Sequence, residues 1–161
     1  MPTPAPVSPD LVLTKEEFLW GRLVIPRIGV DAPFEERGMD EYGVMQDPSG
    51  REKVGWYNFM PLPNEGKNVF LAGHLQYGGS PAVFWNLGQL EAGDEVIIWA
   101  GGVEFHYVIV SKEYRTKADS IHSVTDPVDT EVVTLMTCAG EFVPAANDFS
   151  HRWILRGVRT N

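Results

Sequence analysis

Residues 94–110, DEVIIWAGGVEFHYVIV, decide the fold class of this 161-residue chain. Two runs rich in β-branched and aromatic residues, 94–100 and 103–110, are separated by the pair Gly101-Gly102. Two glycines between two such runs are a signal of a tight hairpin, because both positions of the turn need a positive φ. The stretch therefore predicts two antiparallel strands that pair with each other.

Similar short apolar runs recur on both sides of this hairpin. They cover residues 21–30, where Pro26 divides the run, and residues 67–73, 131–137 and 152–158. Neither an internal repeat nor a regular alternation of strands with helices is found, which disfavours a parallel α/β sheet. The pattern favours an all-β fold, a closed seven- to eight-stranded β-barrel with one or two short helices.

Two segments carry helix signals. Residues 14–20 begin with Thr14, and Glu17 follows three positions later, which is the capping-box pattern. Residues 80–90 begin with Ser-Pro, a favourable helix start, and carry an apolar stripe. The stripe consists of Val83, Leu87 and Leu90. We expect a short helix in each segment, and polar loops at residues 111–130 and 139–151.

The composition limits the kinds of function. Hydrophobic residues make up 43% of the chain, enough for one core, and no run approaches the ~20 apolar residues of a spanning helix. The net charge is −9 and Lys and Arg do not cluster, so no nucleic-acid partner is expected. The proline-rich residues 1–13 predict a spacer that precedes one folded domain at residues 14–161.

Cys138 is the single cysteine, so it is either a small buried hydrophobe or a free thiol kept for its chemistry. It follows the predicted strand 131–137, His74 follows the strand 67–73, and Arg152 begins the last strand. If the last two strands are antiparallel neighbours, Cys138 and Arg152 face each other across the loop that joins them. The position of His74 beside them depends on a topology that the spacing leaves open.

These three residue types suit acyl transfer. A thiol is only partly ionised at neutral pH, and a nearby imidazolium or guanidinium raises its thiolate fraction. A permanently charged arginine stabilises the oxyanion that forms when a thiolate attacks a carbonyl. A histidine protonates the departing amine and deprotonates the incoming one.

Several segments resemble the sortase family of cysteine transpeptidases. TLMTC at residues 134–138 resembles the TLxTC signature, and AGH at 72–74 is similar to the segment with the family histidine. RWIL at 152–155 resembles the strand that bears the family arginine, and VIPRIGV at 24–30 resembles the opening strands. The likeness runs from about Gly21 to the C-terminus in the family order.

The resemblance implies an eight-stranded barrel with His74, Cys138 and Arg152 as catalytic residues. It also implies a membrane-anchored enzyme outside the bacterial cell, with an anchor absent from this sequence. Such enzymes cleave an LPxTG-like sorting signal between Thr and Gly and pass the acyl group to a cell-wall amine. Thr137, Ala139 and His122 are the substrate-binding candidates.

No cofactor is implied, and no metal site is predicted. Calcium stimulates some members of the family through loop carboxylates, and the candidates for this role, Glu104, Glu113 and Asp119, are scattered along the chain. An Asp-Pro-aromatic lid motif is not found, which argues against the pilus-building type, and AGEF at 139–142 resembles sortases outside the housekeeping class. The class stays open.

Two other functions are compatible with the same residues. The first is a thiol hydrolase or amidase that uses water as its normal acceptor. The second is a barrel that binds cell-wall material without catalysis, in which Cys138 is structural.

Overall fold

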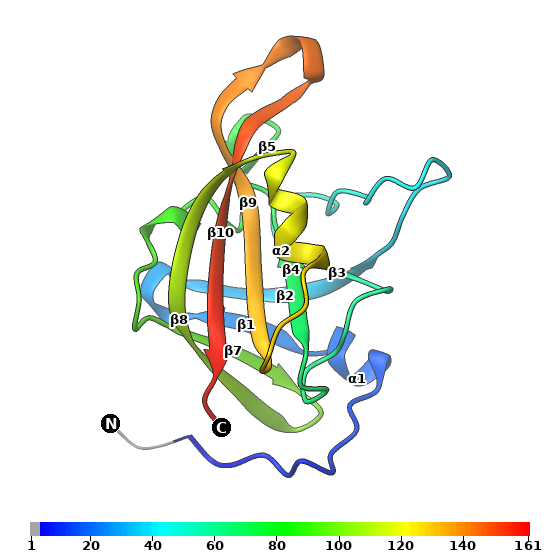
Figure 1. Cartoon of the computed structure of the whole chain (residues 1–161), viewed down its shortest axis with the longest axis vertical. Coiled ribbons are helices and arrows are strands. Elements are labelled where there is room, and N and C mark those ends of the chain that lie inside the picture. The colour runs from blue at the N-terminus through cyan, green and yellow to red at the C-terminus, as the bar shows by residue number, and fades with distance from the viewer. Residues whose placement is uncertain (1–3) are drawn as a thin grey trace.

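Eight strands close into a barrel within residues 4–161, the part of the chain that the computed structural model describes (Figure 1). In order around the barrel they are β1 (Arg22–Ile25), β2 (Val30–Arg37), β3 (Val54–Tyr57), β4 (Asn68–Ala72), β9 (Val132–Val143), β10 (Asp148–Arg159), β8 (Val103–Thr116) and β7 (Glu95–Ala100). β2 pairs with β3 and β4 pairs with β9 in parallel, and the other neighbours are antiparallel. The predicted fold class is confirmed.

The barrel interior holds one hydrophobic core. Side chains alternate between the two faces of each strand, so every second residue of β4 and β9 points inward. The inward residues of these two strands in the core are Val69, Leu71, Val133 and Leu135. The intervening side chains of the same strands, such as Met136, lie on the outer wall instead, where the candidate site is found.

The β7–β8 hairpin has the predicted turn. Ala100 pairs with Val103, and Gly101 and Gly102 have φ values of 59° and 78°. Side chains other than glycine rarely adopt these values, which explains the glycine pair.

Three strands are longer than predicted. β8 runs on to Thr116, β9 runs to Val143 and β10 begins at Asp148. The predicted loops 111–130 and 139–151 are therefore wrong in part, because backbone pairing continues beneath polar side chains that obscure the strand pattern. The β9–β10 hairpin projects beyond the barrel (Figure 1) and turns through a 3₁₀ segment, Pro144–Ala146, with φ of 50° at Asn147.

The two predicted helices have different outcomes. α1 (Lys15–Leu19) is present, with Thr14 and Glu17 in a reciprocal capping box. The prediction of a helix at residues 80–90 is wrong. β5 (Gln76–Tyr77) and β6 (Ser80–Pro81) form a small hairpin there, and a 3₁₀ turn, Leu87–Gln89, follows it. Leu87 and Leu90 are nevertheless buried in the core, so the stripe indicated burial correctly and its conformation incorrectly.

Further 3₁₀ turns and one helical turn complete the chain. They are the 3₁₀ segments Pro26–Ile28 and Asp119–Ile121, and α2 (His122–Thr125) within the predicted loop 111–130. α2 is fastened to the barrel by Ser123, whose carbonyl oxygen accepts from Asn68 Nδ2 at 2.8 Å and from an Arg156 nitrogen at 3.1 Å. Both donors come from the barrel strands, so α2 is held on the outer wall beside β4 and β9.

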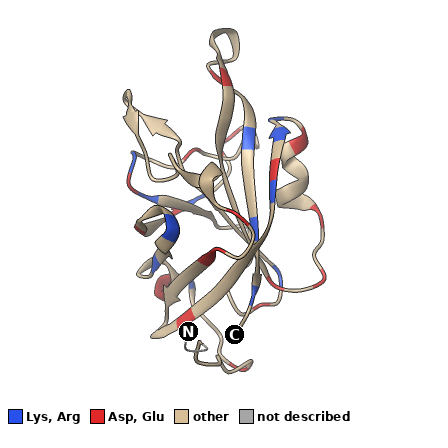
Figure 2. Ribbon diagram, turned by 90° about the vertical axis from the view of Figure 1, so that its left-hand side faces the viewer, with Lys and Arg blue, Asp and Glu red and all other residues tan. Residues whose placement is uncertain are grey.

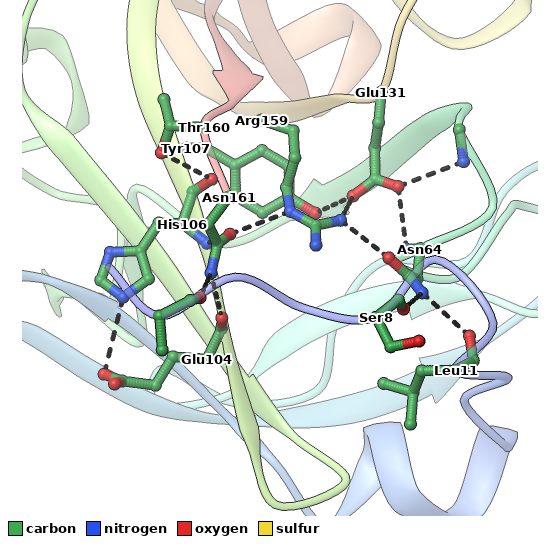
Figure 3. A network of polar contacts seen from close by, with 12 residues as sticks. Ser8, Leu11, Asn64, Glu104, His106, Tyr107, Glu131, Arg159, Thr160 and Asn161 are labelled. Atoms are coloured by element: carbon green, nitrogen blue, oxygen red, sulfur yellow. Dashed lines mark hydrogen bonds and ion pairs between the residues drawn. The ribbon is translucent and has the colours of Figure 1, made fainter. Parts of the chain in front are cut away.

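The buried carboxylate of Glu131 organises a polar network (Figure 3). The network lies at the end of the barrel opposite the β9–β10 hairpin. Glu131 accepts from Arg159 Nη1 at 2.9 Å and from the Tyr107 hydroxyl at 2.6 Å, and its other oxygen accepts from the Asn64 and Gly66 amides. The side chains of Glu131 and Arg159 are only 6% and 11% exposed. Burial, together with the neighbouring carboxylate, raises the pKa of Tyr107 well above its ordinary value.

The same network reaches the N-terminal segment that the sequence predicts as a spacer. Asn64 Nδ2 donates to the carbonyl oxygens of Ser8 and Leu11 at 3.0 and 2.9 Å (Figure 3). Val7 and Leu11 pack against the core, and Leu13 is buried. The described part of this segment therefore lies along the barrel wall, while the boundary at residue 13 stays a prediction.

We predict that Glu131→Ala lowers the free energy of unfolding by about 3–5 kcal/mol, because it leaves the buried Arg159 guanidinium without its counterion. Urea unfolding followed by circular dichroism measures the loss. The control is Glu52→Ala, an exposed glutamate, for which we expect a change within about 0.5 kcal/mol. Equal effects of the two substitutions would contradict the role of the network.

Candidate active site

Strand pairing brings Cys138 and Arg152 together. In the antiparallel β9–β10 ladder these two residues are direct partners, as the sequence predicts. Neighbouring strands lie about 4.8 Å apart, so the two side chains leave the sheet side by side. Both lie within long strands, however, so the predicted positions at strand ends are wrong. The ladder continues past them because Ala139 pairs with His151.

The parallel ladder between β4 and β9 brings in His74. It pairs Asn68 with Val132 and continues in step to Ala72 and Met136. Contacts extend it beyond the end of β4, since the Gly73 amide donates to Met136 O at 3.2 Å. One further step in the same register takes His74 to the level of Cys138. The register thus places His74, two residues beyond the end of β4, at the level of Cys138 on one side, and Arg152 is the direct partner of Cys138 on the other.

Thr137 fastens this arrangement from inside the barrel. Its side chain is 3% exposed, and its hydroxyl donates to Gly73 O at 2.8 Å. The hydroxyl thus ties β9, directly before Cys138, to the residue directly before His74. Because it faces inward, the geometry does not support the expectation that this hydroxyl binds a peptide.

The histidine ring is held by a backbone carbonyl. His74 Nε2 lies 2.6 Å from Pro48 O, and since a carbonyl oxygen only accepts, Nε2 carries the proton. The Tyr77 ring lies beside the imidazole, with centroids 5.3 Å apart. Nδ1 is left as the basic nitrogen, which suits proton exchange with a neighbouring thiol.

Burial raises the pKa of the Cys138 thiol above its ordinary value, and the charge of Arg152 acts against this. The carboxylates of Asp148 and Asp47 raise this pKa further, and Lys117 lowers it slightly. The net direction is upward, so the protonated thiol predominates at neutral pH in the free protein. Nucleophilic attack therefore requires a base that removes the proton.

Arg152 is enclosed by the β9–β10 hairpin. Its Nη1 donates to the carbonyl oxygens of Phe149 and His151 at 3.1 and 2.9 Å, and its Nη2 donates to both carboxylate oxygens of Asp148 at 3.1 and 2.9 Å. The side chain is 12% exposed. Sequence reasoning did not find Asp148, because the contact depends on an irregularity of β10 between Phe149 and His151 that the spacing does not reveal.

An apolar cluster lies next to the thiol on the outer wall. Its buried members are Tyr57, Phe70 and Val124, and its partly buried members are Met45, Met60, Ala72 and Met136. Met136 lies two residues before Cys138, and so on the same face of β9. The cluster thus joins side chains of β3, β4, β9 and α2, and α2 lies beside β9 in Figure 1.

The other substrate-binding candidates lie in different surroundings. Ala139 is 5% exposed and points into the barrel wall opposite His151, so only its backbone is suited to contact a ligand. His122 is exposed on α2, where Nδ1 lies 3.2 Å from an Asp126 oxygen. Its role stays a prediction.

The structure also bears on metals and on charge. Among residues 4–161, no three His, Cys, Asp or Glu side chains gather where they could hold a metal ion. The carboxylates named for calcium lie apart, and the nearest partner of Glu113 is Arg115. Acidic and basic segments are scattered over many elements in Figure 2.

A family model for the sortase domain matches residues 23–160, and these include every strand of the barrel. The chain belongs to the sortase family. The match extends over the histidine, cysteine and arginine positions described above, and it makes this protein a sortase-type transpeptidase.

Solved sortase structures share this fold. Sortase A from Corynebacterium diphtheriae, in a lid mutant, superposes with a TM-score of 0.69 at 21% identity, over 89% of this chain and 70% of that one. A Clostridium perfringens sortase D5 transpeptidase gives 0.65 at 23% identity, over 88% and 78%. Sortase C-1 from Actinomyces oris gives 0.66 at 25% identity, over 91% and 76%.

A search of curated proteins found no match to this sortase. Its structural relatives carry the names of several sortase classes, which leaves its own class open. In the described residues, no helix is long and apolar enough to cross a membrane.

We predict that iodoacetamide alkylates Cys138 with a pH midpoint above that of the unfolded chain, because burial disfavours the thiolate. The rate is measured across alkaline pH on the native protein, and the same protein in urea gives the reference. A native midpoint at or below the reference would show that nearby cations outweigh burial.

Proposed function

We propose that this sortase cleaves a C-terminal LPxTG-like sorting signal between Thr and Gly and transfers the acyl group to a cell-wall amine. The surroundings of Cys138 support this most strongly, because Arg152 is its direct partner on β10 and the β4–β9 register brings His74, two residues after β4, to the same level.

The first half of the reaction forms a thioester. His74 takes the thiol proton of Cys138, and the thiolate attacks the threonine carbonyl carbon of the signal. Arg152 stabilises the negative charge that develops on the carbonyl oxygen. The carbon–nitrogen bond then breaks, the imidazolium protonates the glycine amine, and the amine leaves.

The second half transfers the acyl group. An amine replaces the departed peptide, and neutral His74 accepts its proton while its nitrogen attacks the thioester carbon. Arg152 again stabilises the oxyanion. The carbon–sulfur bond breaks, the thiolate recovers its proton from the imidazolium, and the new amide leaves the enzyme.

The apolar cluster beside the thiol suits the leucine and proline of such a signal. Its partly buried members, Met136 and Ala72 among them, present apolar side chains at the surface, and the buried Phe70 supports them from below. Methionine adapts to varied apolar shapes, which fits a site that accepts related signals. We further propose that the enzyme works at the bacterial surface, where sortases act.

We predict that an LPxTG-like peptide is cleaved and joined to an added oligoglycine amine, and that Cys138→Ala abolishes both reactions. Mass spectrometry of the products, with and without the amine, measures how the acyl group partitions. If only hydrolysis occurs, the protein is a thiol hydrolase. The assay is repeated with a library of related peptides. If no peptide gives a product or an adduct on Cys138, the result supports the alternative of a barrel that binds cell-wall material without catalysis.

We predict that Arg152→Lys lowers kcat by roughly 100- to 1000-fold while the fold is retained, because lysine lacks the planar fork of donors. The matched control is Arg22→Lys, an exposed arginine on β1 paired with Asp31, which should keep full activity. A normal kcat for Arg152→Lys would remove this residue from the oxyanion site.

A further inference from the structure

The charged groups behind Arg152 form a chain that the proposed reaction does not use. Asp148 begins β10, and its two oxygens accept from Arg152 Nη2. Lys117 follows β8, and its Nζ lies 2.6 Å from Asp148 Oδ2. The carboxylate thus lies between two cations, one of them directly opposite the thiol.

The backbone of β10 is bent to allow this contact. Residues four apart in a regular strand are separated by about 13 Å, too far for a short aspartate to hold the guanidinium comfortably. The β9–β10 register shifts between Phe149 and His151, where an irregularity breaks the ladder. Such bulges re-aim side chains near functional sites.

The contacts of Arg152 account for most of its donors. Its two terminal nitrogens donate to Asp148 and to two hairpin carbonyl oxygens. A guanidinium has three nitrogens, and within residues 4–161 Nε is the one that no hydrogen bond engages. The end of the side chain is therefore fixed by the hairpin, and Nε–H stays available to a ligand next to Cys138.

We propose that Asp148 is a positioning residue, which holds the Arg152 guanidinium so that its Nε–H serves the oxyanion next to Cys138. This inference rests on the proposed role of Arg152 in acyl transfer. Lys117 supports the carboxylate from the other side, and the net charge of the three groups is +1 when all are ionised.

The same carboxylate has an opposing effect on the thiol. The charged groups around Cys138 are Arg152 and Asp148 from β10, Lys117 after β8, Asp47 before β3, and His74 after β4 when it is protonated. The charge of Asp148 disfavours the thiolate, while its hydrogen bonds order the oxyanion donor. Removing the charge must therefore move two measurable properties in opposite directions.

The pKa of Asp148 agrees with an ionised carboxylate. Burial alone would raise this pKa, but hydrogen bonds from Lys117 and the Phe149 amide and the charge of Arg152 lower it below the ordinary value. The carboxylate is thus charged throughout the range in which the thiol titrates.

The test compares Asp148→Asn with wild type in two assays. We expect kcat for peptide ligation to fall about 10- to 100-fold, with little change in KM, because the guanidinium loses its fixed position. We expect iodoacetamide alkylation of Cys138 at pH 7 to become at least about twofold faster. Because the thiol itself becomes more reactive in this variant, a fall in kcat reports the loss of the positioned guanidinium and not a weaker nucleophile.

Three comparisons sharpen the result. Asp148→Glu should recover part of kcat, and Asp129→Asn, an exposed aspartate between α2 and β9, should change neither assay. In the Arg152→Lys background, Asp148→Asn should add little further loss of kcat, because the residue acts through the arginine. Full additivity, or an unchanged kcat in Asp148→Asn, would overturn the proposal.

A third readout separates this inference from the proposed function. Arginine side-chain NMR should show a slowly exchanging, well-dispersed Arg152 Nη2–H signal in wild type, because Asp148 holds this nitrogen, and the signal should broaden in Asp148→Asn. If wild type fails to ligate any peptide but this loss and the faster alkylation appear, the positioning holds and the proposed function fails. If ligation proceeds and Asp148→Asn leaves the signal intact, the positioning fails alone.

Discussion

The backbone ladders on the two sides of β9 determine what this protein can do. β9 pairs in parallel with β4 and antiparallel with β10, so one strand sets both neighbours of Cys138. Hydrogen-bonded registers are fixed to a whole residue, because a slip by one would turn every core side chain outward. The order of histidine, thiol and arginine therefore depends on the packing of Val133 and Leu135 as much as on local contacts.

Part of this site could be predicted from the sequence, and there is a physical reason why the rest could not. The opposition of Cys138 and Arg152 follows from one hairpin, a local feature that two apolar runs reveal. The neighbour on the other side, His74, is placed by a parallel pairing between distant segments. Spacing along the sequence cannot specify such a pairing, so only the family resemblance predicted the position of His74. Strand ends were missed where polar residues continue the ladder, as at Thr116 and Asp148.

The resting site combines opposing requirements. Burial and the Asp148 carboxylate raise the pKa of the thiol, which lowers its reactivity towards chance electrophiles, whereas the charge of Arg152 lowers this pKa. The Pro48 carbonyl oxygen holds the His74 ring, and the Asp148 carboxylate holds the Arg152 guanidinium. Both side chains are thus oriented before a ligand arrives, which is a general requirement for catalytic groups.

The polar network around Glu131 has a practical consequence for immobilising the protein or fusing it to a tag or another domain. Asn161 Nδ2 donates to Ala5 O at 2.8 Å, so the two ends of the described chain meet at one pole of the barrel. The β9–β10 hairpin projects from the other pole (Figure 1). A bead, a tag or a fused domain joined at either end would thus leave the thiol side unobstructed, and both points of attachment would transmit pulling force to the barrel through the same few hydrogen bonds.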